Sequence, residues 1–113
     1  MMKIAIIGSR DSKNITPEFI IENLPKSFSE IVSGGAIGID TLAQSVATKL
    51  GVKFTCFKPN YSLYGKTAPI VRNTQIIDYV DYVLAFWNGS SKGTKFVISQ
   101  CLNKNKPLKV IYI

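Results

Sequence analysis

The stretch from Ile31 to Thr41 constrains the fold of this chain more than any other segment. It begins as an apolar strand, passes through glycines at positions 34, 35 and 38, and continues with a helical pattern. Glycine permits a sharp turn and a close approach of a ligand to the backbone. The first turn of a helix offers unpaired N–H groups and the positive end of its dipole to an anion. The stretch therefore predicts a phosphate-binding loop, with a tight turn that only packs helix on strand as the alternative.

Apolar, β-branched runs typical of strands in a parallel sheet alternate with amphipathic helical segments along the chain. The expected strands cover residues 3–7, 30–33, 52–57, 81–86 and 108–113. Such alternation predicts an α/β fold, a doubly wound parallel sheet of about five strands with about four helices on its two faces. At 113 residues, the chain is expected to form a single domain, 1–113.

The predicted helices begin at recognisable capping signals. Thr16 can cap the first helix, with Pro17 in its first turn. The helix after the glycine loop has two candidates: Asp40 as a simple N-cap, or Thr41 in a capping box, which would leave Asp40 free to face a ligand. Thr94 is the expected cap of the last helix.

Composition narrows the possible chemistry. The formal charge of +7 favours polyanionic partners, although the lysines are scattered and also fit a solvated basic surface. The chain has no histidine, which removes the commonest general base and metal ligand, and no metal site is expected. Cys56 and Cys101 do not form a disulfide framework or CxxC site. No signal peptide or membrane span is evident, so a cytoplasmic location and no membrane partner are expected.

Right-handed crossovers bring all loops that follow strands to one edge of such a sheet, where ligands bind. The longest irregular stretch, 59–69, contains Tyr61, Tyr64 and Lys66, so it is expected to form a lid that stacks on a base, or else to cover the core. Arg72 lies early in the next helix, against the dipole preference, which favours an anion there. Trp87 is either a stacking platform or a residue at the rim of the core.

Several motifs follow one another in an order that points to a known group of proteins. They are Gly8-Ser9-Arg10, Ser33-Gly34-Gly35-Ala36-x-Gly38-x-Asp40, Tyr64-Gly65-Lys66-x-Ala68, Arg72-Asn73, and Ala85-Phe86-Trp87-x-Gly89-x-Ser91-x-Gly93-Thr94. Together they resemble the SLOG superfamily, and within it the small YspA or cpYpsA-related branch. The resemblance implies a Rossmann-like fold that binds a nucleotide or nucleotide-derived ligand, often as a homodimer.

The same resemblance includes proteins with different activities. DNA-processing protein A binds single-stranded DNA, LOG phosphoribohydrolases release a base from a nucleoside monophosphate, and others sense ADP-ribose-like signals. Here Val97 stands where the LOG motif has its glutamate, and Ile37 stands where many relatives have an arginine. The acidic residue that binds the ribose of a dinucleotide is also missing about 20 residues past the loop.

Three functions are compatible with these features. The chain is expected to bind or sense a nucleotide or nucleotide-derived small molecule, without a required cofactor. The alternatives are an N-glycosidase that uses Asp40 on nucleoside monophosphates, and a protein that binds single-stranded nucleic acid. The candidate ligand-binding residues are Gly8, Ser9, Arg10, Gly34, Gly35, Ala36, Gly38, Asp40, Tyr64, Lys66, Arg72, Asn73, Trp87, Gly89, Ser91, Gly93 and Thr94.

Overall fold

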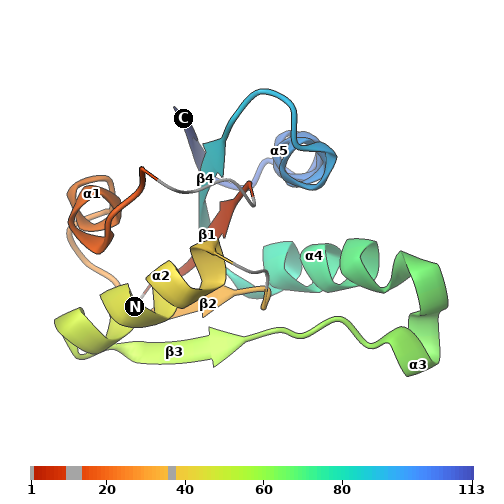
Figure 1. Ribbon diagram of the computed structural model, residues 1–113, viewed down its shortest axis with the longest axis horizontal. Coiled ribbons are helices and arrows are strands. Elements are labelled where there is room, and N and C mark those ends of the chain that lie inside the picture. Colours follow the sequence, from red (N-terminus) through yellow and green to blue (C-terminus); the bar gives the residue numbers. More distant parts are fainter. Residues whose placement is uncertain (1, 10–13, 36–37) are drawn as a thin grey trace.

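A computed structural model describes residues 2–9, 14–35 and 38–113, and its centre is one parallel sheet (Figure 1). The strands are β1 (Lys3–Gly8), β2 (Glu30–Ser33), β3 (Lys53–Cys56), β4 (Tyr82–Trp87) and β5 (Leu108–Tyr112). They pair side by side in the order β3-β2-β1-β4-β5, and every pairing is parallel. The predicted α/β class and the Rossmann-like arrangement are confirmed.

Helices cover both faces of the sheet. They are α1 (Pro17–Glu22), α2 (Ile39–Leu50), α3 (Tyr61–Tyr64), the 3-10 helix η1 (Gly65–Thr67), α4 (Ala68–Tyr79) and α5 (Lys92–Asn103). In Figure 1, α1 and α2 lie on one side of the sheet, and α4 and α5 lie on the other. The chain changes sides after β3, because β4 pairs with β1 rather than with β3.

Successive strand residues point to opposite faces, so the sheet has a hydrophobic core on each side. Ile6 and Leu84 pack with buried residues of α1 and α2 on one face. Ala5 and Val83 pack with buried residues of α4 and α5 on the other. The central strands β1 and β4 therefore contain continuous apolar runs, which are typical of strands covered on both faces.

The helix starts are only partly as expected. Thr16 caps α1, because its hydroxyl accepts a hydrogen bond from the Phe19 N–H at 3.1 Å, and Pro17 follows in the first turn. Both alternatives for α2 are wrong: its N-cap is Gly38, with a φ of 92° that favours glycine and no side-chain cap. Ser91 caps α5 by accepting from the Thr94 N–H at 3.4 Å, so Thr94 is not the cap.

The stretch 59–69 also differs from its expectation as an irregular loop. It forms α3 and η1, which reach away from the sheet (Figure 1). Helical spacing also predicts buried positions for four apolar side chains that are exposed in the structure, namely Phe19, Leu50, Ile70 and Leu102. Among the described residues, none of the helices combines the length and apolarity needed to cross a membrane.

Candidate ligand-binding site

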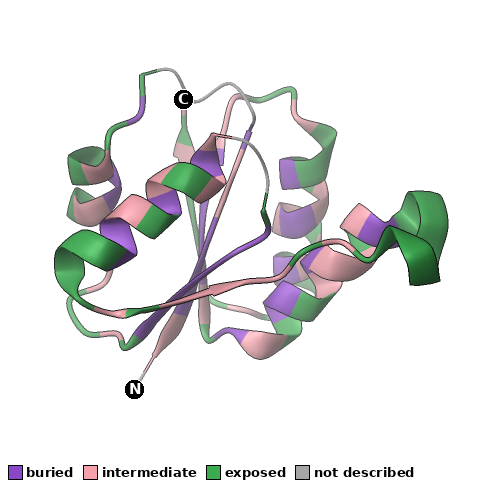
Figure 2. Cartoon of the chain, turned by 60° about the horizontal axis from the view of Figure 1, so that its bottom comes forward, coloured by how far each residue is buried: buried purple, intermediate pink, exposed green. Residues whose placement is uncertain are grey.

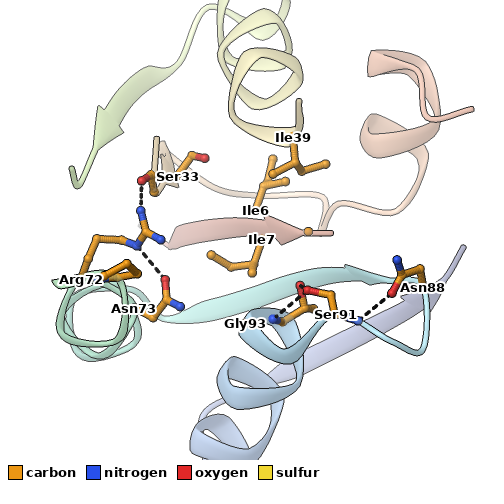
Figure 3. A pocket seen from close by; sticks show the side chains of 13 residues that line it. Ile6, Ile7, Ser33, Ile39, Arg72, Asn73, Asn88, Ser91 and Gly93 are labelled. Carbon is orange, nitrogen blue, oxygen red and sulfur yellow. Dashed lines mark hydrogen bonds between the residues drawn. The ribbon is translucent and has the colours of Figure 1, made fainter. Parts of the chain in front are cut away.

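A pocket of about 520 Å³ opens at the carboxyl ends of β1, β2 and β4 (Figure 3). This is where the strand order reverses direction, since β2 and β4 flank β1 on opposite sides. Ligands of open α/β sheets bind at such a switch point. The lining residues are Ile6, Ile7, Gly8, Ser33, Gly34, Ile39, Pro69, Arg72, Asn73, Asn88, Ser91, Gly93 and Thr94.

Arg72 connects two walls of the pocket. Its Nη1 donates a hydrogen bond to the carbonyl oxygen of Gly34, and its Nε donates to Asn73 Oδ1 at 2.7 Å (Figure 3). Gly34 makes room for this contact, because a Cβ there would lie 2.9 Å from Arg72 Nη1. Burial lowers the pKa of Arg72, and nearby Tyr61, Cys56 and Asp40 partly offset that lowering. The guanidinium is thus a fixed part of the pocket wall.

Two asparagines in the pocket are oriented by their side-chain oxygens. Asn73 Oδ1 accepts from Arg72, and Asn88 Oδ1 accepts from the N–H groups of Ser90 and Ser91 at 2.8 and 2.9 Å. Each amide nitrogen is then left as the group that can donate to a ligand. A hydrogen bond from the Asn88 N–H to Ser9 Oγ, 3.2 Å long, also stabilises the turn around Asn88.

Ser33 contributes a polar group of a different kind. It is the last residue of β2 and one of the residues that line the pocket, but it is only 1% exposed and its hydroxyl oxygen is buried. Its hydroxyl has no hydrogen-bond partner among the described residues. Buried hydroxyls are normally hydrogen-bonded, so this one requires an explanation.

Asp40 lies beside the pocket rather than in its lining. Its Oδ1 accepts a hydrogen bond from the Gly35 N–H at 3.0 Å, and Cys56 Sγ lies 3.8 Å from the same oxygen. Burial raises the pKa of the Cys56 thiol, and the nearby Asp40 carboxylate adds to that effect. Asp40 therefore closes the glycine loop onto the start of α2. Within the described part of the chain, no carboxylate lines the pocket.

The pocket brings together seven of the predicted residues, which are Gly8, Gly34, Arg72, Asn73, Ser91, Gly93 and Thr94. Arg10 and Ala36 lie outside the described residues. The others surround the pocket or lie away from it, namely Ser9, Gly35, Gly38, Asp40, Tyr64, Lys66, Trp87 and Gly89. Trp87 donates from Nε1 to the Ser91 carbonyl at 3.1 Å, so it supports the loop before α5.

Sequence reasoning missed two polar residues of the lining, Ser33 and Asn88. Both could have been found from position alone, since each lies at or just after the carboxyl end of a strand. It also missed the apolar wall formed by Ile6, Ile7 and Ile39, which looks like ordinary core in the sequence. The described Asp, Glu and Cys side chains do not gather in a group of three that could hold a metal ion.

The first half of the sequence matches a known protein family. The model of the family DNA recombination-mediator protein A matches residues 1–60, which is more than half of the chain. The chain belongs to this family. The matched residues run from β1 through β3 and include the glycine loop and Ser33. The expected relationship to DNA-processing protein A is thereby confirmed. Neither the curated proteins nor the solved structures give a significant match.

Proposed function

We propose that the pocket binds a nucleotide or a nucleotide-derived small molecule. The observation that carries the proposal is the buried hydroxyl of Ser33, which lines the pocket without a partner among the described residues. A buried polar group without a partner costs about 1–3 kcal/mol. Rotation of its side chain toward the pocket would let Ser33 hydrogen-bond to a ligand, and this bond would remove the cost. The hydroxyl is thus best explained as part of a binding site.

The rest of the pocket fits the same ligand class. A volume of about 520 Å³ suits a small molecule. Ile6, Ile7 and Ile39 offer an apolar wall to a base or the carbon face of a sugar. The amide nitrogens of Asn73 and Asn88 can donate to oxygen atoms of a sugar or phosphate. Because α2 starts without a side-chain cap, its first N–H groups can also donate to a phosphate.

We also place the chain in the YspA or cpYpsA-related branch. The motifs that carry this assignment after residue 60 include Arg72-Asn73 and Ser91-x-Gly93-Thr94, and all five named residues belong to the pocket lining. This branch membership predicts a homodimer. Light scattering on the purified protein measures the subunit number.

The direct test is a mass spectrum of small molecules released when the purified protein is denatured. We expect a nucleotide or a derivative of one, with less released from Ser33→Ala. Thermal unfolding with added nucleotides tests weaker binding, because ligand at ten times Kd adds about 1.4 kcal/mol of stability. If no nucleotide at millimolar concentration raises Tm and none is released, the proposal fails.

Single-stranded DNA is the second candidate ligand. Two observations favour it: the family is that of a DNA recombination mediator, and the charge of the chain is unevenly distributed. Residues 41–77 and 82–113 contain ten lysines and arginines but no aspartate or glutamate. Binding to an oligonucleotide should weaken steeply with salt, because phosphate contacts release counterions. Affinity that does not change between low and high salt would contradict this candidate.

The N-glycosidase alternative has less support. Asp40 was its expected catalytic base, but this carboxylate accepts the Gly35 N–H and does not line the pocket. Val97, at the position of the LOG glutamate, is buried in the core under α5. Chromatography of nucleoside monophosphates after incubation with the protein would detect any free base.

A further inference from the structure

The segment 61–67, which comprises α3 and η1, forms an arm at one end of the molecule. It packs mainly against α4 and lies apart from the other helices (Figure 1). Every residue from Asn60 to Thr67 is exposed, and Figure 2 shows this end as a continuous green projection. The arm therefore adds little to the hydrophobic core, and its composition calls for another explanation.

The exposed side chains of the arm and of the adjoining turn of α4 are largely apolar. Tyr61 is 61% exposed, Leu63 67% and Tyr64 37%, while Ile70 at the start of α4 is 50% exposed. Four large apolar side chains exposed within ten residues are unusual on a protein surface. Such a patch marks a site of interaction.

Charge identifies the kind of partner. The nearest charged residues in sequence are Lys58, Lys66 and Arg72, and no acidic residue occurs between positions 41 and 77. Two copies of the chain meeting at this patch would bring like charges together. A polyanion would instead be attracted to it. Exposed aromatic rings interspersed with cations are the features that bind single strands, because bases stack on the rings while phosphates lie near the cations.

The arm is also connected to the pocket. It packs against α4, and the start of this helix carries Pro69, Arg72 and Asn73 of the pocket lining. A DNA strand lying on the arm would therefore run toward the pocket.

We propose that the arm is a stacking platform for single-stranded DNA, with Tyr61 and Tyr64 beneath successive bases and Lys66 beside the phosphates. This inference rests on the second candidate function given above. It goes further by naming the surface and the mode of contact.

The test is fluorescence anisotropy of a labelled 12-nucleotide oligothymidylate with the full chain. The double variant Tyr61→Ala/Tyr64→Ala should bind about tenfold or more weakly, whereas Tyr61→Phe/Tyr64→Phe should bind almost normally because the rings remain. Tyr112→Ala is the matched control, since Tyr112 is 75% exposed on the edge strand β5. Lys66→Gln should reduce the slope of log affinity against log salt concentration by about one, which corresponds to the loss of one phosphate contact.

Four other results of this experiment would count against the proposal. If the unmodified protein binds the oligonucleotide and the double alanine variant binds equally well, the arm proposal is overturned and DNA binding stands. If the unmodified protein does not bind, the DNA function itself fails and the arm proposal fails with it. Equal affinity for a 12-base-pair duplex would overturn stacking, because paired bases are not free to stack on the rings. Conversion of a dimer into monomers by the double alanine variant would identify the arm as a subunit interface and overturn the proposal.

Discussion

Arg72 donates a hydrogen bond to the carbonyl oxygen of Gly34, and this contact joins α4 on one face of the sheet to the loop that leads to α2 on the other. The two residues are 38 positions apart in sequence. The same guanidinium also donates to Asn73 Oδ1. One side chain therefore holds the glycine loop at Gly34 and orients the side-chain amide of Asn73 in the pocket.

Gly34→Ala should disturb the pocket without straining the backbone. The new Cβ would lie 2.9 Å from Arg72 Nη1 and 3.0 Å from its Cδ and Cζ, so the guanidinium must move away from the carbonyl. We expect a loss of about 1–3 kcal/mol in unfolding free energy. Urea unfolding measures it. Gly93→Ala is the control, because its Cβ would meet nothing within 4 Å. Alanine also favours a helix more than glycine does, so the unfolding free energy of this variant should rise by about 0.5–1 kcal/mol. Equal stability of Gly34→Ala and the unmodified protein would contradict the Arg72 contact.

Arg72→Lys should be more harmful than a charge-conserving change usually is. A lysine ammonium cannot reproduce the planar fork that reaches both Gly34 and Asn73. We expect a loss of about 1–2 kcal/mol and weaker nucleotide binding, both measurable by thermal unfolding with and without ligand. Lys95→Arg, exposed on α5, should change stability by less than about 0.5 kcal/mol. A normal ligand response in Arg72→Lys would show that the fork is dispensable.

Ser33→Ala separates a binding role from a structural one. Since the hydroxyl has no partner among the described residues, its removal should leave the stability of the free protein unchanged or slightly higher. If a ligand uses this hydroxyl, the variant should bind it about fivefold or more weakly. Calorimetric titration measures both affinities, with Ser99→Ala on the exposed side of α5 as control. A clear loss of stability without ligand would mean that Ser33 has a structural partner.

Glu30 should make stability depend on pH in the acid range. Burial raises the pKa of this carboxyl, but hydrogen bonds from the Thr55 and Tyr79 hydroxyls, each 2.7 Å long, and the nearby Lys53 and Lys3 outweigh burial and lower it overall. The folded protein therefore binds this proton less readily than the unfolded chain does. The stabilisation is complete above the ordinary value of 4.5 and is lost as pH falls through the lowered pKa.

The corresponding measurement is urea unfolding from neutral pH down to pH 3. We expect Glu30→Gln to be less stable than the unmodified protein at neutral pH and to flatten the acid part of the profile. Glu18→Gln is the control, since its ion pair with Lys49 is exposed and contributes about 0–1 kcal/mol. If unfolding free energy depends on acid pH in the same way in Glu30→Gln and in the unmodified protein, Glu30 is not the source of this dependence.

The sequence by itself determined the elements and their order. Continuous apolar runs marked β1 and β4, because a strand covered on both faces has no polar side. Thr16-Pro17 marked the start of α1. Glycine is also the residue that ends α2, where Gly51 has a left-handed φ of 66°. Alternation of strands and helices then fixed a parallel sheet and the edge at which the pocket lies.

Only the tertiary structure decided which side chains face the pocket and which helix ends are capped. Asp40 accepts a hydrogen bond from the Gly35 N–H instead of capping α2. Helical periodicity defined a face for Ile70 and Leu102 but not what covers it, and both remain exposed. Likewise, the partner of Arg72 is a backbone carbonyl 38 residues away, which local sequence patterns do not encode. Contacts between distant segments depend on how the helices pack on the sheet, and that packing is a property of the whole fold.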